Sequence, residues 1–330
     1  MNKVKEFNAQ LLMDDLESHL QQFNYGDNPK ELYQPISYIM SLGGKRLRPL
    51  LSLMSYSLYK DDYRNILTPA AAIEVFHNFT LMHDDIMDEA PLRRGKKTVH
   101  EKWNANTAIL SGDVMLVKAY DMLLEVDPSI LPQILRRFNK TAAEVCEGQQ
   151  QDMNFETRDD VSEGDYIDMI RLKTAVLLGF SLEYGALLAG ASEHDARCLY
   201  DFGVNIGIGF QLKDDLLDVY ADKAKFGKQV GGDIMSNKKT FLLIKAKELA
   251  HGSVEEKLQD LLQMKPSENE TKVKEVTAIY DQLNIKGLTE EKMAAYFNKG
   301  FEKLSSLEVQ NPHVLQQIIQ LTEELINREK

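Results

Sequence analysis

Proline is the feature that most constrains what this chain can fold into. The 330 residues contain nine prolines, and none falls between Pro132 and Pro266. Because a proline inside a helix costs about 3 kcal/mol, this proline-free stretch is permissive for many helices. Apolar residues recur there at helical spacing, as at Leu172, Val176 and Phe180, and no segment shows sustained strand-like alternation. The pattern predicts an all-α protein with about a dozen helices, in a single domain over residues 1–330.

Two short segments predict where helices begin. Thr68 followed by Pro69 combines a residue favoured at the N-cap with one favoured at the first helical position. Ser162, which is also a residue type favoured at the N-cap, stands directly before an acidic residue. We therefore expect helices that start directly after Thr68 and after Ser162.

Charge and cysteine content narrow the functional classes. The chain has 39 Lys+Arg against 51 Asp+Glu, a net charge of −12, which argues against nucleic acid or an anionic membrane as the main partner. Cys146 and Cys198 cannot form a disulfide framework and favour a reducing compartment. The most apolar stretch, residues 175–191, carries Glu183 and is interpreted as a buried helix, not a membrane span. We expect a soluble, cytoplasmic protein.

Two of the five Asp-Asp pairs extend to the pattern DDxxD, each at the end of an apolar helical stretch. The residues are Asp84, Asp85 and Asp88 in the first acidic cluster and Asp214, Asp215 and Asp218 in the second. Positions i and i+4 share a helix face, where like charges repel unless a cation joins them. Oxygen ligands suit Mg²⁺, which typically binds one or two carboxylates plus substrate phosphates. Each cluster alone could be a solvated acidic face, but together they favour two helices that face each other across a metal- and phosphate-binding cavity.

Basic residues follow or precede the acidic clusters in short motifs. The segment GGKRLRP spans residues 43–49, RRG follows the first cluster, and Lys228 and Lys238 follow the second. Arginine presents a planar fork suited to phosphate, and lysine acts as a point charge. Any one of these residues could instead be a solvated surface charge. Lys173 is the exception, because its neighbours are apolar and a buried ammonium group needs a partner.

The ordered motifs resemble those of the trans-isoprenyl diphosphate synthases, the polyprenyl synthetase family. In order they are GGKRLRP, FHNFTLMHDDIMD, RRG, GQQQD, LKT and FQLKDDLLD, then a GK and a later lysine, and they cover nearly the whole chain. The resemblance implies an all-α bundle around a central cavity, the isoprenoid synthase type I fold, usually as a homodimer. It also implies condensation of isopentenyl diphosphate with an allylic diphosphate. The loop RRGKKTVH departs from the family in having Lys97 where proline is common.

The resemblance further implies roles for individual residues. The metal ligands would be Asp84, Asp88 and Asp214, which hold about three Mg²⁺ and the allylic diphosphate, with support from Asp85, Asp215 and Asp218. The ligands on the allylic side would be Arg93, Lys173, Thr174, Gln211, Lys228 and Lys238. The isopentenyl diphosphate pocket would consist of Lys45, Arg48, His77 and Arg94. The residues that would take part directly in catalysis are Asp84, Asp85, Asp88, Arg93, Lys173, Asp214 and Asp215.

The implied reaction is a head-to-tail condensation. Metal ions and cationic side chains stabilise the departing diphosphate, which leaves an allylic carbocation in an apolar cavity that excludes water. The double bond of isopentenyl diphosphate attacks this cation, and a proton is then lost, by expectation to the released diphosphate. No side chain needs to be a dedicated general base.

Bulky residues before the first acidic cluster form the cavity floor in this family. Phe76, Phe79 and Thr80 precede Asp84 by eight, five and four positions. An aromatic residue followed by Thr at this place resembles geranylgeranyl diphosphate synthases of archaeal type, and farnesyl diphosphate is the alternative product. At roughly 100° per residue, Phe79 points about 140° from Asp84, so it borders the cavity only if the helix is suitably placed.

Two other functions remain open at this point. A class I terpene cyclase shares the first Asp-rich motif, but it normally has a different second metal motif and lacks GGKRLRP. A non-catalytic subunit would modulate a partner synthase, but such members tend to lose an Asp-rich motif. This chain keeps both motifs.

Overall fold

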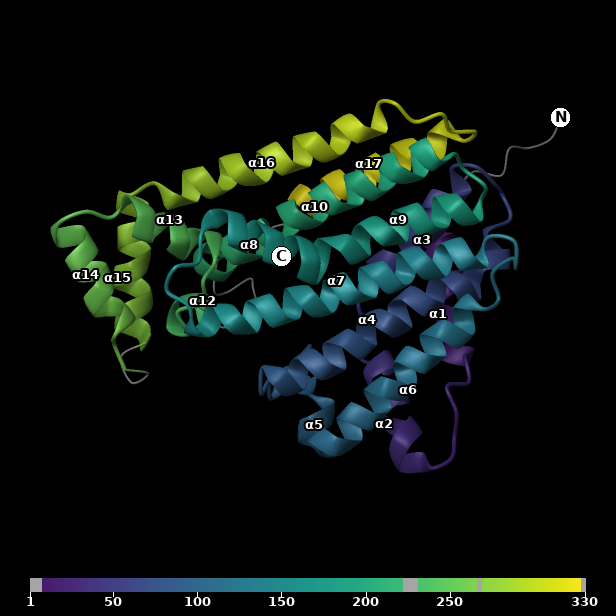
Figure 1. Cartoon of the computed structure of the whole chain (residues 1–330), viewed down its shortest axis with the longest axis horizontal. Helices are drawn as coiled ribbons and strands as arrows, with labels where there is room; N and C mark the ends of the chain where they lie inside the picture. The colour runs from purple at the N-terminus through teal and green to yellow at the C-terminus, as the bar shows by residue number, and fades with distance from the viewer. Residues whose placement is uncertain (1–7, 222–230, 266–268, 328–330) are drawn as a thin grey trace. The chain divides into compact units, whose positions relative to one another are not determined.

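The computed structural model describes residues 8–221, 231–265 and 269–327, and this part of the chain is mostly helical (Figure 1). The predicted all-α class is therefore confirmed. Lys228 lies outside the described residues. Within the described ranges, no helix has both the length and the apolar character that crossing a membrane requires.

The chain divides into two compact units, each built from segments that are distant in sequence. The first unit consists of residues 1–140, 180–200 and 307–320, and the second of residues 141–179, 201–306 and 321–330. Four long helices contain residues of both units: α7 (Leu131–Thr157), α9 (Val176–Leu188), α10 (Glu193–Tyr220) and α17 (Pro312–Asn327). The single domain over residues 1–330 stays a prediction.

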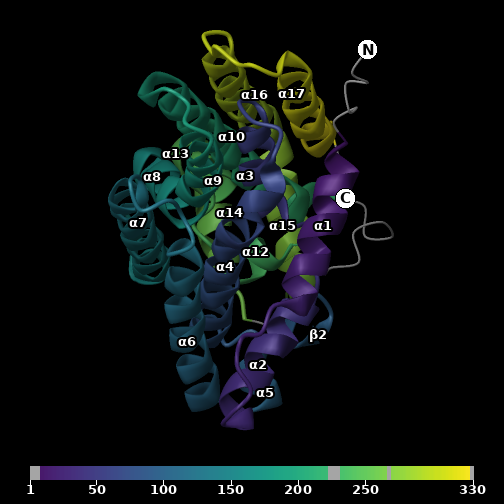
Figure 2. The same cartoon turned by 90° about the vertical axis from the view of Figure 1, so that its right-hand side faces the viewer.

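The first unit is organised around α4. In chain order it holds α1 (Ala9–Gln22), α2 (Lys30–Ser41), α3 (Leu47–Ser57), the 3₁₀ turn η1 (Tyr63–Ile66), α4 (Leu67–Met87), the strands β1 (Leu92–Arg93) and β2 (Lys96–Lys97), α5 (Val99–Lys102) and α6 (Ala105–Leu123). Helix α4 contacts α1, α2, α3 and α6, and Figure 2 shows these helices beside one another. Its residues 70–76, which include three alanines, are all buried, so neighbouring helices approach it closely. This packing fixes the position of the C-terminal end of α4.

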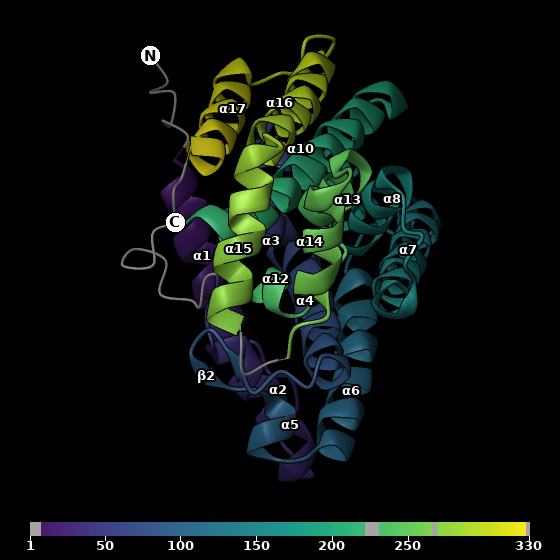
Figure 3. The same ribbon diagram turned by 90° about the vertical axis from the view of Figure 1, so that its left-hand side faces the viewer.

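The second unit surrounds the C-terminal part of α10 with shorter helices. They are α8 (Glu163–Ile170), the π-helical turn η2 (Arg171–Ala175), α12 (Gly232–Met235), α13 (Phe241–Leu249), α14 (Ser253–Leu262), α15 (Asn269–Gln282) and α16 (Ile285–Leu304). Helices α14 and α15 pack together, and α13 packs on α16 (Figure 3). Leu216, Leu242, Val276 and Ile285 belong to one buried hydrophobic cluster shared by these helices. This core packs α12 against the C-terminal part of α10.

The helix starts and turns test the local predictions. The predicted start at Thr68 is wrong: α4 begins at Leu67, because η1 already winds the preceding residues. The start after Ser162 is confirmed, with the Asp165 N–H donating to Ser162 Oγ at 3.1 Å in a reciprocal capping box. Strands were not expected, yet β1 and β2 pair as a two-residue antiparallel hairpin. The Tyr38 hydroxyl donates to the Lys97 carbonyl at 2.7 Å and holds this hairpin on α2.

The buried-helix interpretation of residues 175–191 is confirmed for α9. Glu183 in this helix is only 4% exposed and is paired with Arg137. Burial raises the pKa of Glu183, and the arginine charge opposes that shift. The one charged residue in the most apolar stretch of the chain is therefore a buried carboxylate that is stabilised by an arginine partner.

Candidate active site

The first acidic cluster occupies the C-terminal end of α4. Asp84 and Asp85 lie in the last turn, and Asp88 is the C-cap residue. This end of a helix carries the negative end of the helix dipole, so three carboxylates are unfavourable there unless cations join them. Arg93, in β1, supplies one cation: its Nε lies 3.0 and 2.9 Å from the two oxygens of Asp85, and its Nη2 lies 3.6 Å from Asp84 Oδ2.

The three carboxylates of this cluster differ in accessibility. Asp85 is 2% exposed, and burial raises its pKa while the ion pair with Arg93 opposes that shift. The side chain of Asp84 is 20% exposed, and Asp88 is exposed. The middle residue is therefore held by the protein, whereas the two outer residues are more exposed than the middle one.

The second acidic cluster lies near the C-terminal end of α10 and has the same arrangement. Asp214 is exposed, Asp218 is half-buried, and the middle residue Asp215 is 5% exposed. Asp215 accepts hydrogen bonds from the Tyr166 hydroxyl and, at 3.3 Å, from Gln211 Nε2. Burial raises the pKa of Asp215 to about 7. Again the middle carboxylate is fixed by protein donors.

Neighbouring segments fix the rest of the second cluster. Thr174 Oγ1 donates to Gln211 Oε1 at 3.4 Å, so two predicted allylic-side ligands contact each other. The backbone N–H of Asp233, in α12, donates to Asp218 Oδ2 at 2.9 Å. Asp233 adds another carboxyl group beside this cluster, and burial raises its pKa to about 6. The structure describes each cluster within its own unit, and the expectation that the two helices face each other stays a prediction.

Lys173 has the partner that its apolar surroundings require. Its Nζ lies 2.6 Å from Asp152 Oδ2, and Lys238 Nζ lies 3.9 Å from the same oxygen. Gly148 allows α7 to approach η2, because a Cβ there would lie 2.2 Å from the Lys173 backbone nitrogen. In the sequence, Gly148 and Asp152 stand four residues apart and so share one helix face. Both contact Lys173, which lies 25 and 21 positions further along the chain, and the sequence alone does not indicate this contact.

The residues predicted for the isopentenyl diphosphate pocket lie near the middle of α4. Arg48 Nη1 lies 3.1 Å from His77 Nε2, and Arg94 donates to the carbonyl of Gly43. Burial, followed by the charges of Arg48 and Arg94, holds the pKa of His77 well below its usual range. A neutral His77 can accept the arginine hydrogen bond. Lys45 is exposed in the same turn, so the structure brings together all four residues predicted for the isopentenyl diphosphate pocket.

The residues predicted to set product length belong to an aromatic cluster. Phe76 is 1% exposed, and its ring centroid lies 5.7 Å from that of Phe79 and 5.0 Å from that of Phe138. Thr80 uses its hydroxyl to donate to the His77 carbonyl at 2.8 Å. Phe138, in α7, is a member that the sequence did not single out. Nothing in its local pattern distinguishes it from an ordinary core residue.

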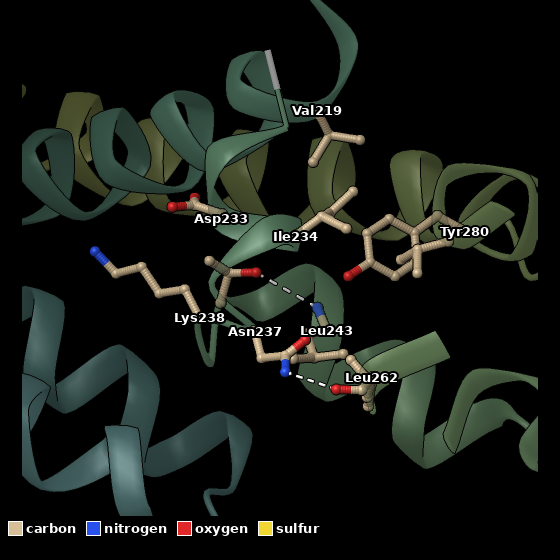
Figure 4. A pocket seen from close by; sticks show the side chains of 10 residues that line it. Val219, Asp233, Ile234, Asn237, Lys238, Leu243, Leu262 and Tyr280 are labelled. Carbon is tan, nitrogen blue, oxygen red and sulfur yellow. Dashed lines mark hydrogen bonds between the residues drawn. The ribbon is translucent and has the colours of Figure 1, made fainter. Parts of the chain in front are cut away.

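A small cavity lies beside α12 and is lined by residues of the second unit alone (Figure 4). Its volume of about 10 Å³ is room for roughly one water molecule, so it is far too small for an isoprenoid diphosphate. Asn237 Nδ2 donates to the Leu262 carbonyl at 2.9 Å, and Asn237 Oδ1 is buried without a hydrogen-bond partner among the described residues. The Tyr280 side chain points into the same space in Figure 4.

The donors of the acidic clusters fit Mg²⁺ when a diphosphate completes the coordination. In the described ranges, no group of three or more His, Cys, Asp or Glu side chains is arranged to hold an ion alone. Mg²⁺ usually binds one or two carboxylates together with substrate phosphates and waters. Accessible, oxygen-only donors at the negative ends of helices meet this requirement.

Comparisons with known proteins agree with the arrangement of motifs. A geranylgeranyl pyrophosphate synthase of Geoglobus acetivorans is 42% identical over 248 residues, 74% of this chain and 76% of that protein. A geranylgeranyl diphosphate synthase of Methanosarcina mazei is 44% identical over 220 residues, 66% of this chain and 68% of that protein. A crystal structure of a geranylgeranyl pyrophosphate synthase superposes with a TM-score of 0.92 at 41% identity, covering 98% of this chain and 100% of that one. The family model described as polyprenyl synthetase matches residues 29–280. The chain belongs to the polyprenyl synthetase family.

Proposed function

We propose that the protein is a geranylgeranyl diphosphate synthase, a short-chain trans-prenyltransferase that condenses isopentenyl diphosphate with allylic diphosphates and releases diphosphate. The observation that carries this proposal is the shared design of the two DDxxD clusters. In each, the middle carboxylate is buried and hydrogen-bonded by the protein, and the outer ones remain accessible. Relatives named as geranylgeranyl diphosphate synthases support the same function.

The outer carboxylates would hold the metal. Asp84 and Asp88 in the first cluster and Asp214 in the second would bind Mg²⁺ together with diphosphate oxygens, with about three ions in all. When bound, Mg²⁺ supplies positive charge that stabilises the leaving diphosphate. Asp85 and Asp215 would act by fixing their neighbours, since their oxygens already accept hydrogen bonds from Arg93, Tyr166 and Gln211.

The remaining cations would bind and orient the two substrates. On the allylic side, Arg93, Lys173 and Lys238 would bind diphosphate oxygens, and Thr174 and Gln211 would add neutral hydrogen bonds. The carbon–oxygen bond to the diphosphate breaks, and the primary carbon becomes an allylic cation. The double bond of isopentenyl diphosphate attacks that carbon, and the proton lost next goes to the released diphosphate. The protein contributes binding, orientation and exclusion of water, and no step needs a side-chain base.

Isopentenyl diphosphate would bind the arginine-rich turn of the first unit. Lys45, Arg48, His77 and Arg94 offer donors to one diphosphate, and the neutral imidazole adds no charge that the arginines would repel. Arg48 Nε is buried without a hydrogen-bond partner among the described residues. A buried donor of this kind favours an anionic ligand that accepts from it.

Phe79 would limit the product to geranylgeranyl diphosphate, with Phe76 as a second barrier. Phe79 is half-buried, whereas Phe76 is buried and braced by Phe138, so Phe79 is the member that a growing chain would meet first. We expect Phe79→Ala to lengthen the product by about one isoprene unit, since one helical turn rises about 5.4 Å. Chromatography of the products checks this. An unchanged product distribution would remove Phe79 from the argument.

A homodimer would form through α6. Leu110 and Val117 in α6 and Leu124 at its C-cap are each 58% exposed and recur every seven residues, which places them on one helix face. An apolar stripe of this kind is typical of an interface. We expect Val117→Asp to shift the protein from dimer to monomer in size-exclusion chromatography with light scattering. A monomeric wild-type protein would contradict the proposal. A cytoplasmic location is proposed as well, because the chain has only two cysteines, Cys146 and Cys198, which are too few for a disulfide framework.

Substitution at the first cluster tests the metal-dependent function. We expect Asp84→Asn to lower kcat/KM in an isopentenyl diphosphate elongation assay by at least about 100-fold, because it removes a metal ligand. Asp159→Asn is the matched control, since Asp159 begins an exposed Asp-Asp pair outside DDxxD. Equal activity of both variants would contradict the metal role. Ionisation of the allylic substrate with no elongation would instead favour a terpene cyclase, and no activity without a partner protein would favour a non-catalytic subunit.

A further inference from the structure

We infer that the buried ion pair between Arg46 and Glu74 positions the isopentenyl diphosphate pocket, although neither side chain would touch substrate. The inference rests on the proposed function, because it concerns the substrate assigned to Lys45, Arg48, His77 and Arg94. Arg46 lies within GGKRLRP, but its neighbours in the motif carry the predicted ligand roles. Its own role follows from its contacts.

We do not assign Arg46 as a substrate ligand, because it is buried and each of its three guanidinium nitrogens already donates to the protein. It is 4% exposed, and its Nε, Nη1 and Nη2 donate to Glu17 Oε1 at 3.0 Å, Glu74 Oε1 at 2.7 Å and the Met40 carbonyl at 2.6 Å. These acceptors belong to α1, α4 and α2. One side chain thus joins three helices at the start of a fourth, α3.

The same contacts fix the conformation of the ligand-bearing turn. Arg46 is the N-cap residue of α3 and has a left-handed backbone with φ of 44°. For a residue with a side chain this conformation is unfavourable, so it needs anchoring from outside the turn. Lys45 and Arg48 flank Arg46 closely in the chain. The direction in which both side chains point therefore depends on where Arg46 is held.

Glu74 connects this turn to the other half of the pocket. Glu74 is 2% exposed and lies one helical turn before His77 in α4. Asn78 Nδ2 donates to both the Glu74 carboxylate, at 3.0 Å, and the Glu74 carbonyl, at 2.9 Å, which fixes the carboxylate on the helix. The ion pair consequently sets the turn of Arg48 against the face of His77, where Arg48 Nη1 and His77 Nε2 lie 3.1 Å apart.

Charge supports the same division of roles. Glu74 is the carboxylate to which Arg46 donates directly, and its negative charge also acts on Arg48 and Arg94. The buried negative charge of Glu74 thus offsets part of the repulsion between the positive charges of these arginines. Arg46 is the arginine that donates to the Glu74 carboxylate. Arg48 and Arg94 therefore keep donors for a diphosphate.

The test is Arg46→Lys, which keeps the positive charge but loses the fork that reaches three acceptors. We expect the KM for isopentenyl diphosphate to rise on the order of 10- to 100-fold, while kcat and the KM for the allylic substrate change less than about threefold. A merely structural loss would lower the active fraction and would leave both KM values unchanged. Arg64→Lys is the control, because its ion pair with Asp15 is a surface pair, with the Arg64 side chain 54% exposed.

A second variant keeps the inference testable if Arg46→Lys does not fold. Glu17→Gln weakens only the contact at the more exposed end of the network, where the side chain is 31% exposed, and should raise the KM for isopentenyl diphosphate by a smaller factor. An unchanged KM in the variants that fold, or equal changes for both substrates, would overturn the inference. If the variants give either of these results while the wild-type protein elongates allylic diphosphates, only this inference fails and the proposed function stands. A wild-type protein that does not elongate defeats the proposed function itself.

Discussion

Replacing His77 with glutamine should reduce the acid sensitivity of folding. In the folded protein, burial and the charges of Arg48, Arg94, Arg93 and Arg46 keep the pKa of His77 well below the usual 6.5. In the unfolded chain the same group has a pKa of about 6.5. Below that pH the unfolded state therefore binds more protons than the folded state. The stabilisation is fully present above pH 6.5 and is lost as the pH falls below it.

The size of the effect follows from this difference in proton binding. If His77 stays neutral when folded, the free energy of unfolding at about pH 5.5 is lower by about 1.4 kcal/mol than at about pH 8. The contact with Arg48 explains why the group resists protonation, since an imidazolium would place two cations 3.1 Å apart.

Urea unfolding at about pH 5.5 and about pH 8 measures the effect. We expect the wild-type protein to lose about 1.4 kcal/mol more than His77→Gln between these values, with His313→Gln, at an exposed histidine, matching the wild type. Equal losses in wild type and His77→Gln would refute the reasoning, because His77 would then be protonated in the folded state.

Two further substitutions test the lysine site of the second unit. Asp152→Asn should lower the free energy of unfolding by about 2 kcal/mol and raise the KM for the allylic diphosphate, since it removes the charge paired with Lys173 at 2.6 Å; wild-type values for both would contradict this role. Gly148→Ala should destabilise by about 3 kcal/mol in thermal unfolding, because its Cβ would meet the Lys173 backbone. Gly164→Ala, whose Cβ would lie 3.7 Å from Ser162 Oγ, is the control, and equal losses in both glycine variants would argue against the close approach.

Features that depend on local sequence were predicted well. Proline spacing and helical periodicity predicted the all-α class, and the cap at Ser162 was found because its partner lies three residues away. The start of α4 was missed because η1 winds the chain before Thr68 and leaves that residue inside the helix. The β1–β2 hairpin was missed because two-residue strands carry no periodic signal.

Features that depend on contacts between distant segments were predicted only in part. The need of Lys173 for a partner followed from its apolar neighbours, but Asp152 could not be chosen among many carboxylates. The acidic residues were identified by spacing, whereas the burial of Asp85 and Asp215 required the three-dimensional packing. The role of Arg46 was likewise hidden, since its acceptors come from three helices.

Product analysis of the purified protein tests the central claim most directly. The protein is incubated with labelled isopentenyl diphosphate, farnesyl diphosphate and Mg²⁺, with a parallel sample containing a chelator, and the products are sized by chromatography. The account predicts geranylgeranyl diphosphate as the main product, formed only with metal. No metal-dependent elongation of any allylic diphosphate, including dimethylallyl and geranyl diphosphate, would contradict it.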